Sequence, residues 1–551
     1  MSLTFADPSA AMGAEEEAAL ESRINELLGR MTLDEKIGQM RQIHADHDEL
    51  PADLRSEIAA GRVGSLINAV NPEMTNEAQR VAREESRLGI PLLIGRDVIH
   101  GFRTIYPIPL GLAATFDPSL VEATARAAGE EAASKGINWT FAPMIDVTRD
   151  PRWGRIAESP GEDPYLASVL AVAMVDGFQG DDLSARDTIA ACAKHFAGYG
   201  ASEAGRDYNT TNIPENELRN VHLVPFHAAV QAGVASIMAS FSDLNGVPAT
   251  GNRWLFRDVL RREWGFKGMT VSDWASIPEL ADHGFTEDDR GSALAAFGAG
   301  IDMEMATTTY QTHLPELLAE GLIDEETLDA MVANILRLKL RLGLFDRPAV
   351  PPMEPDPATS QHLELARRAA LESLVLLKND ENLLPLDPEA VGSVAVIGPL
   401  ADSPPDQLGT WIFDGDRSLA VTPLQSLREL SDVEINYVRT LETSRSRDQG
   451  AFQEAIDAAN RSDVVLLFLG EEVIITGEAH SRADIRLPGA QEELIHALGK
   501  LGKPAVLVIL AGRPLALQNI VDAVPALLYA WHPGASGGPA IVDVLFGMES
   551  P

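Results

Sequence analysis

The stretch Gly265–Trp274, with the sequence GFKGMTVSDW, places an acidic side chain directly after a short apolar run. The apolar residues Met269–Val271 are typical of a strand buried on both faces, as in a parallel sheet. A polar group at the carboxyl end of such a strand faces the mouth of a parallel barrel. We therefore expect Asp273 to act as a nucleophile and Trp274 to pack against a sugar ring. The alternative is that Ser272 or Asp273 caps the following helix.

Other polar side chains recur where apolar runs end. They are Asp97, Asp146, Lys194 with His195, and Glu304. Burying a lysine without a partner is costly, so Lys194 indicates a polar cavity or a bound anion. The alternatives are a structural ion pair for Lys194 and a loop cap for Asp97. Several such groups around one barrel mouth would make a site.

Two polar loops could add to it. Arg149–Arg155 (RDPRWGR) is dense in arginine, as expected for a site loop, an ion-pair clamp or a solvated surface loop. Gly470–Asp484 follows an apolar strand in the second half of the chain, and ligands bind outside the carboxyl ends of strands in open α/β sheets. This places Glu471, Glu472 and Glu478 where a carboxylate could reach a shared site, although solvation is the default role of an acidic loop.

Strand-like runs alternate with helical segments over more than half of the chain, which predicts a (β/α) TIM-like barrel. Helix starts are marked by Thr32 with Glu35, a capping box, and by Asp117 before Pro118. The expected strands are Gly61–Asn68, Pro91–Asp97, Asn138–Val147, Ile189–Phe196, Ala235–Ser242, Gly268–Trp274 and Gly300–Met305.

A second alternating region predicts a smaller α/β sandwich domain with a mostly parallel sheet. Its expected strands are Ser393–Pro399, Val464–Gly470, Ala505–Leu510 and Ala526–Trp531. We expect a frayed N-terminus over 1–21, the barrel over 22–346, a Pro-rich linker over 347–362 and the second domain over 363–551. The chain stops soon after an apparent helix, as a truncated domain would.

The composition limits the possible partners. A chain of 551 residues is too long for one core, and 82 acidic against 44 basic side chains give a net charge of −38. Such a surface repels nucleic acid and anionic lipid, so a neutral substrate is expected. The single cysteine, Cys192, lies in an apolar run and predicts a buried, inert thiol, and no metal or other cofactor is expected. The N-terminus lacks the features of a signal peptide, which predicts a cytoplasmic protein, or a periplasmic or secreted one if a signal was removed.

Seven short motifs occur in an order that resembles the β-glucosidase branch of glycoside hydrolase family 3. They are GRDVIHG (95–101), RDPRWGR (149–155), AKHFAGYG (193–200), GFKGMTVSDW (265–274), LLKND (376–380), LPL (384–386) and AGRP (511–514). In this family a barrel is followed by an α/β sandwich domain, and the site lies between them. The resemblance implies a retaining exo-β-glucosidase that acts on terminal β-D-glucosyl residues of oligosaccharides and β-glucosides, as a monomer or homodimer.

The resemblance implies Asp273 as nucleophile and Glu478, from a second-domain loop, as acid/base, with Glu471 and Glu472 as alternates. It implies sugar-hydroxyl ligands at Asp97, Arg155, Lys194 and His195, and Trp411 or Phe413 could stack on the ring with Trp274. Asp273 has to be ionised, and we expect Lys194 and Arg155 to lower its pKa, whereas Glu478 sits on a less cationic loop and should keep its proton. The two carboxyl groups should lie about 5–5.5 Å apart.

Two departures and three alternatives accompany the resemblance. Many relatives have a tyrosine at Phe241, so a hydroxyl on the nucleophile is missing here or comes from Ser242. Many also continue into a fibronectin-like domain. A β-xylosidase or exo-β-glucanase differs only in pocket shape, and an N-acetylhexosaminidase would carry a histidine at Tyr199. A non-catalytic sugar-binding protein would lack one of the two carboxylates.

Overall fold

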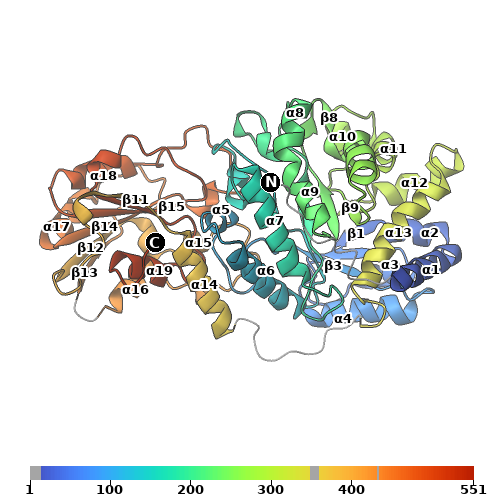
Figure 1. Ribbon diagram of the computed structural model, residues 1–551, viewed down its shortest axis with the longest axis horizontal. Helices are drawn as coiled ribbons and strands as arrows, with labels where there is room; N and C mark the ends of the chain where they lie inside the picture. The colour runs from blue at the N-terminus through green and yellow to red at the C-terminus, as the bar shows by residue number, and fades with distance from the viewer. Residues whose placement is uncertain (1–13, 348–358, 431–432) are drawn as a thin grey trace.

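The computed structural model describes residues 14–347, 359–430 and 433–551 (Figure 1). Residues up to Arg341 form a ring of parallel strands surrounded by helices, on the right of Figure 1. The ring contains β1 (Arg41–His44), β2 (Ser65–Ile67), β3 (Leu93–Arg96), β4 (Trp139–Thr140), β5 (Cys192–Phe196), β6 (Ser236–Ala239), β9 (Met269–Val271) and β10 (Glu304–Met305). Strands pair in the orders β10-β1-β2-β3-β4 and β5-β6-β9, and the parallel bridges Trp139–Ala190 and Val271–Met303 join the two sets. The predicted (β/α) barrel is confirmed.

The barrel helices cover the outside of the ring, and the two predicted helix starts are confirmed. Thr32 and Glu35 form a reciprocal capping box, and the Asp117 side chain accepts hydrogen bonds from the first turn of the next helix. A small hairpin, β7 (Asp243–Leu244) and β8 (Val247–Pro248), follows β6. The main helices are α1 (Ala14–Arg30), α2 (Leu33–Gln39), α3 (Ala52–Ala59), α4 (Pro72–Arg80), α6 (Pro118–Ala133), α7 (Pro164–Gln179), α9 (Val224–Gln231), α11 (Asp289–Ala299), α12 (Thr309–Ala319) and α13 (Glu325–Arg341).

The N-terminal segment differs from the prediction. Helix α1 begins at Ala14, so residues 14–21 are helical rather than frayed. Ile24 and Leu27 are buried in the barrel core, and Glu21 pairs with Arg337 of α13 at 2.6 Å. These tertiary contacts stabilise the helix, and the acidic side chains of its first turn suit a helix N-terminus. Residues 1–13 and most of the predicted linker, 348–358, lie outside the described residues.

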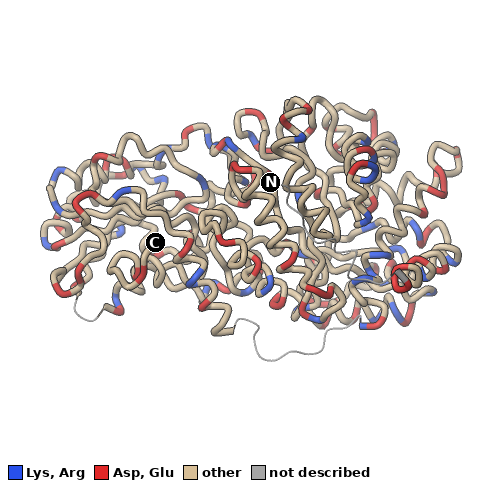
Figure 2. Tube along the Cα trace, in the orientation of Figure 1, with Lys and Arg blue, Asp and Glu red and all other residues tan. Residues whose placement is uncertain are grey.

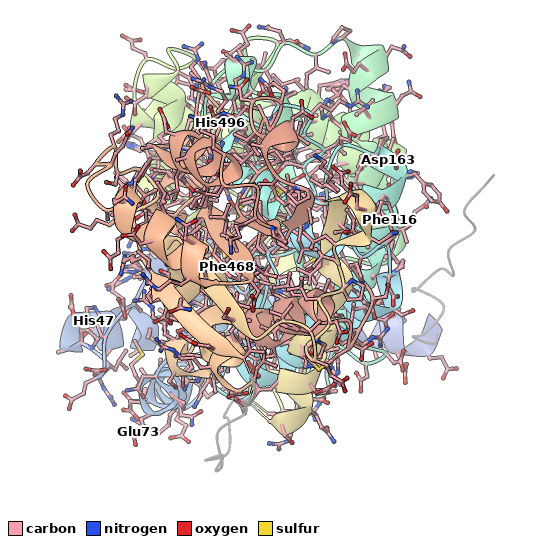
Figure 3. The ribbon with its side chains drawn as sticks, turned by 90° about the vertical axis from the view of Figure 1, so that its left-hand side faces the viewer. His47, Glu73, Phe116, Asp163, Phe468 and His496 are labelled. Carbon is pink, nitrogen blue, oxygen red and sulfur yellow. The ribbon has the colours of Figure 1, made fainter. Side chains whose placement is uncertain are left out.

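The second domain contains a mixed sheet with strand order β11-β16-β15-β14-β12-β13. The strands are β11 (Val375–Asn379), β12 (Ser393–Ile397), β13 (Glu434–Val438), β14 (Val464–Gly470), β15 (Ala505–Leu510) and β16 (Ala526–Tyr529), and only β11 runs antiparallel. Helices α14 (Ser360–Ser373), α16 (Pro423–Arg428) and α19 (Gly537–Leu545) pack on one face, and α17 (Phe452–Arg461) and α18 (Gln491–Gly499) on the other. Figure 3 looks onto this domain, with Phe468 of β14 inside the sheet and His496 on α18.

Alternate side chains of the central strands enter different cores, which explains their continuous apolar sequences. Val394 and Val396 of β12 join one core, whereas Ala395 and Ile397 join the other. Figure 2 shows that acidic residues are spread along the chain in both domains. None of the described helices has the length and apolarity needed to cross a bilayer.

Candidate active site

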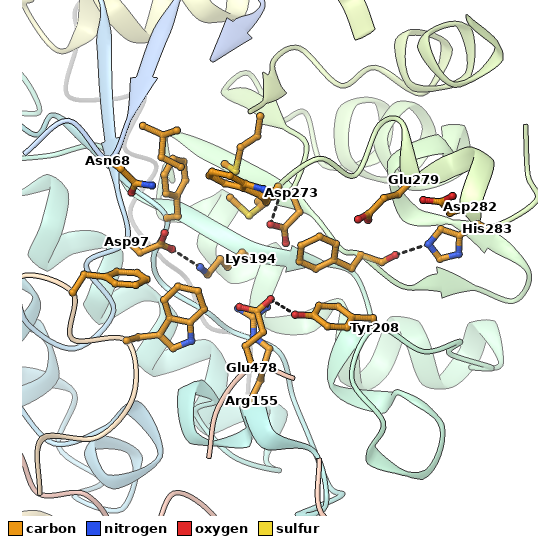
Figure 4. Close-up of a pocket in the computed structure, with 18 residues that line it drawn as sticks. Asn68, Asp97, Arg155, Lys194, Tyr208, Asp273, Glu279, Asp282, His283 and Glu478 are labelled. Carbon is orange, nitrogen blue, oxygen red and sulfur yellow. Dashed lines mark hydrogen bonds and ion pairs between the residues drawn. The ribbon is translucent and has the colours of Figure 1, made fainter. Parts of the chain in front are cut away.

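A pocket of about 670 Å³ opens where the carboxyl ends of the barrel strands meet loops of the second domain (Figure 4). Barrel side chains form most of its wall, and the second domain adds three residues. All of the predicted site residues except His195 line it, namely Asp97, Arg155, Lys194, Asp273, Trp274, Trp411, Phe413 and Glu478. The fold therefore assembles side chains that are up to 381 positions apart in sequence, from Asp97 to Glu478.

Asp273 follows β9 at the mouth of the barrel and is almost completely buried. Its Oδ1 accepts a hydrogen bond of 2.7 Å from the backbone N–H of Trp274. Its Oδ2 has no hydrogen-bond partner among the described residues, although it is buried. The next helix, α10 (Glu279–Asp282), begins after Pro278, so the alternative role of Asp273 or Ser272 as its cap is wrong.

Burial raises the pKa of Asp273 to about 7. Arg155 and Lys194 lower it by attraction and the Trp274 N–H lowers it further, but together they do not offset the loss of solvent. The prediction of a net lowering is therefore wrong, although the two cations act in the expected direction. A buried carboxyl with a strongly perturbed pKa in a cleft is a frequent property of functional sites.

His195 lies beside Asp273 rather than among the residues that line the pocket. Its Nε2 is 3.6 Å from Asp273 Oδ2. Its Nδ1 and its backbone N lie 2.8 Å and 2.9 Å from Asp146 Oδ2, so Asp146 fixes the ring orientation. Burial, followed by repulsion from Arg155 and Lys194, holds the pKa of His195 well below its ordinary value, so the ring is neutral.

Lys194 forms a buried ion pair with Asp97, with 2.9 Å between Nζ and Oδ1. Burial lowers the pKa of Lys194, but Asp97 and other acidic groups outweigh it and the net pKa is raised. The lysine is therefore charged, and Figure 4 shows the pair together at one end of the pocket. Asp97 is used in this pair and not as a loop cap. Glu304 has a structural role, because its carboxylate accepts from the backbone N–H groups of Thr309 and Tyr310 at the start of α12.

Arg155 connects the barrel to Glu478. The guanidinium is buried and makes a two-point pair with Glu158, at 2.8 Å and 3.1 Å. Its Nη1 lies 3.4 Å from Glu478 Oε1. The expectation that Glu478 sits in less cationic surroundings is therefore wrong, because the docked loop brings it against a barrel arginine. Figure 4 shows Glu478 and Asp273 on opposite sides of the pocket.

The two alternate glutamates lie away from the pocket in structural pairs. Glu471 is fully buried between Arg482 and Arg513. Glu472 pairs with Arg445 at 3.0 Å and accepts from the Ser444 hydroxyl at 2.8 Å. Of the three glutamates, only Glu478 lines the pocket.

Aromatic side chains from both domains face the pocket. Trp274 is 43% exposed and its ring meets His44 edge-on at 5.4 Å. Trp411 and Phe413 meet edge-on at 5.2 Å, and Phe413 is 57% exposed. Such accessible faces suit stacking on the apolar side of a sugar ring.

Several pocket residues were not predicted. Asn68, Tyr208, Glu279, Asp282 and His283 line the pocket. Asn68 ends an expected strand and could have been chosen by the same rule as Asp97, whereas the other four lie on a loop or around the short helix α10, where no expected strand ends. Tyr208 belongs to the loop that follows the AKHFAGYG motif, which was the one available clue to this residue.

The structure shows whether Ser242 supplies the hydroxyl that a tyrosine would carry at Phe241. Phe241 lines the pocket, whereas the buried Ser242 bonds to Ser240 at 2.8 Å. Ser242 therefore does not replace the missing hydroxyl.

Comparison with known proteins identifies this arrangement. Residues 32–338 match the glycosyl hydrolase family 3 N terminal domain, and residues 374–551 match the C-terminal domain of that family. A periplasmic beta-glucosidase of Salmonella typhimurium is 40% identical over 97% of this chain and 73% of its own length. A beta-xylosidase of Formosa agariphila is 34% identical over 100% of this chain and 74% of its own.

Solved structures agree with these sequence relatives. The beta-glucosidase from Listeria innocua in complex with glucose has a TM-score of 0.89 at 40% identity, and covers 96% of this chain and 75% of its own. The exo-1,3/1,4-beta-glucanase from a Pseudoalteromonas species has a TM-score of 0.83 at 30% identity, and the match covers 96% of this chain and 68% of the glucanase chain. The protein is thus a glycoside hydrolase. The chain belongs to glycosyl hydrolase family 3.

Proposed function

We propose that this protein is a retaining, exo-acting β-glucosidase that removes terminal non-reducing β-D-glucosyl residues from oligosaccharides and β-glucosides. The observation that carries the proposal is the state of Asp273. One carboxylate oxygen is held by a backbone N–H, and the other is buried beside the pocket without a hydrogen bond from the described residues. An oxygen with unshared electron pairs and no donor is suited to attack a carbon atom.

In the first step, Asp273 Oδ2 bonds to the anomeric carbon while Glu478 gives its proton to the leaving oxygen, and the glycosidic bond breaks. In the second step, Glu478 takes a proton from water, the water oxygen bonds to the anomeric carbon, and the ester to Asp273 breaks. Two inversions retain the β configuration. Asp273 and Glu478 face one another across the pocket, as this exchange requires, and a separation of about 5–5.5 Å remains our prediction.

The terminal sugar is proposed to lie at the end of the pocket where Asp97 and Lys194 meet. Charged groups that are already paired and oriented can exchange hydrogen bonds with sugar hydroxyls at little entropic cost. Trp411 of the second domain lies beside this end, with its ring centroid 5.4 Å from Lys194 Nζ, where it could pack on the terminal sugar. The substrate is a carbohydrate in either of the two main readings, and the preference for glucose over xylose is the finer proposal.

Trapping the intermediate tests the nucleophile. Incubation with a 2,4-dinitrophenyl 2-deoxy-2-fluoro-β-glucoside should label the peptide that contains Asp273, and a label on any other peptide would refute the proposal. Glu478→Ala should keep activity on dinitrophenyl β-glucoside and regain turnover with azide as the nucleophile. Azide rescue of Glu471→Ala instead would transfer the acid/base role.

Specific observations bear on two alternative substrate preferences. Beta-xylosidases and an exo-glucanase are among the similar proteins, so kcat/KM on nitrophenyl β-glucoside and β-xyloside should be compared directly. A preference for the xyloside would overturn the glucosidase assignment and leave the mechanism intact. The N-acetylhexosaminidase alternative places a histidine at Tyr199, but this tyrosine is buried and donates to Asp207.

A further inference from the structure

We propose that Asp207 and Tyr208 of the barrel are positioning residues that hold the Glu478 loop of the second domain in register with the pocket. The inference rests on the proposed role of Glu478 as acid/base. It addresses a specific problem of this fold, because the nucleophile and the acid/base belong to different domains. A misplacement of about 1 Å between them can cost about 100-fold in rate.

Tyr208 contacts the acid/base itself. Its hydroxyl donates a hydrogen bond of 2.7 Å to Glu478 Oε1, which Figure 4 shows as a dashed line. The Tyr208 ring packs edge-on against Phe241 at 5.3 Å, and this contact limits its movement. The backbone of Tyr208 has φ of 61°, a left-handed conformation that a tyrosine adopts at a cost and that the surrounding contacts must maintain.

Asp207 binds the residues next to Glu478. Its Oδ2 accepts a hydrogen bond of 2.7 Å from the backbone N–H of Ala479. Its own backbone N–H donates to the Ser481 hydroxyl at 3.0 Å. The other carboxylate oxygen, Oδ1, accepts from Trp153 Nε1 at 2.9 Å and from the Tyr199 hydroxyl at 2.5 Å. One oxygen of Asp207 thus binds the barrel and the other binds the second domain.

Close backbone packing supports the same register. Gly477 N–H donates to Gly154 O at 3.1 Å, and Arg482 N–H donates to Arg152 O at 2.9 Å. A Cβ at Gly154 would lie 2.0 Å from Gly477 O, so the two loops are in direct contact. These contacts dock the loop backbone, whereas the orientation of the carboxylate depends on Tyr208 and Arg155.

Both side chains contact Oε1 of Glu478. In the described part of the chain, this leaves Oε2 as the oxygen that exchanges the proton with the substrate. We therefore expect Tyr208 to act on the direction in which the Glu478 carboxylate points.

Tyr208→Phe removes the hydroxyl and keeps the ring. We expect kcat/KM on methyl β-glucoside, whose leaving group needs a proton, to fall about 10-fold. On 2,4-dinitrophenyl β-glucoside, whose leaving group needs none, kcat/KM should change less than about twofold.

Asp207→Asn tests the link to the second domain. An asparagine has one acceptor oxygen in place of two, so it can keep the bonds from Trp153 and Tyr199 or the bond from Ala479, but not both. We expect the same split between the two substrates, with a loss of about 100-fold on methyl β-glucoside. Tyr165→Phe, at an exposed tyrosine of α7 outside the pocket, is the matched control and should leave both rates unchanged.

The outcomes separate the two proposals. The positioning role is overturned if Tyr208→Phe and Asp207→Asn lose activity equally on both substrates. It is also overturned if their rates equal those of the Tyr165→Phe control. In either case, azide rescue of Glu478→Ala would still support the acid/base assignment. No rescue of Glu478→Ala overturns both. Thermal unfolding of each variant identifies a folding defect, and either variant alone carries the test if the other fails to fold.

Discussion

The raised pKa of Asp273 predicts an enzyme that loses activity below neutral pH. The nucleophile reacts only as an anion, so kcat/KM should fall as pH drops through the pKa of about 7. At pH 5 about 1% of Asp273 would be ionised in the free enzyme, and kcat/KM should be about 100-fold below its plateau. An aspartate with an ordinary pKa would be more than about 90% ionised at pH 5 and would give a flat profile.

The assay is kcat/KM for 2,4-dinitrophenyl β-glucoside between pH 5 and 9, because this leaving group removes the need for acid catalysis. Lys194→Met deletes a charge that lowers the pKa of Asp273, so the acidic limb should move to higher pH. Lys194 is also a proposed sugar ligand, and for this reason the position of the limb is compared and not the height of the plateau. A constant kcat/KM from pH 8 to 5 would refute the conclusion that burial outweighs the two cations.

A second buried carboxyl has to be separated from this result. Burial also raises the pKa of Asp146 to about 7, and His195 connects Asp146 to Asp273. Asp146→Asn removes that titration and should leave the acidic limb in place. Loss of the limb in Asp146→Asn would assign it to Asp146 instead of the nucleophile.

Three further variants and one control test the structure. Burial lowers the pKa of Lys339 to about 7, so the free-energy cost of burying this lysine grows as pH falls from about 10.5 to 7 and then stays constant. Lys339→Met should therefore raise the free energy of unfolding by at most about 4 kcal/mol at pH 7 and by much less at pH 10, as measured by denaturant unfolding. Gly154→Ala should lower kcat/KM about 100-fold, because its Cβ would displace the Gly477 backbone, while Gly298→Ala, with open space around its Cβ, should not change kcat/KM. Asp97→Asn should leave Lys194 buried without its anion, and cost about 3 kcal/mol in unfolding with a higher KM.

The parts of the fold that could be predicted are those in which one local pattern is sufficient. Strands buried on both faces, such as β14 and β15, are continuous apolar runs and are recognisable alone. Strand β1 was missed because its sequence, RQIH, is short and has only one apolar residue, and the amide of its buried Gln42 bonds to Ser65. Strand β13 is an edge strand with partly exposed residues, so its sequence carries no strong apolar signal.

The site residues also divide into those that a local sequence pattern predicts and those that it does not. Asp97, Lys194 and Asp273 were predicted because the end of a barrel strand determines where a side chain lies. Glu478 could be chosen from its neighbours only through the family resemblance, since nothing local distinguishes it from Glu471. The pKa of Asp273 was predicted with the wrong sign because the number of nearby cations is visible in the sequence, whereas the degree of burial is not.

The division of the site between two domains explains why its interface is rich in polar contacts. Apolar contacts between the domains, such as the cluster of Ile105 with Leu408 and Ala535, hold the domains together without fixing the angle of one carboxylate. Polar contacts position two loops of the second domain. Arg96 pairs with Asp414 at 2.7 Å, and its guanidinium lies 4.7 Å from the Phe413 ring. Asp207 binds the backbone of the loop that follows Glu478. Directional bonds of this kind determine position more than they add stability. On this view, the barrel supplies both the nucleophile and the frame against which the acid/base is aligned.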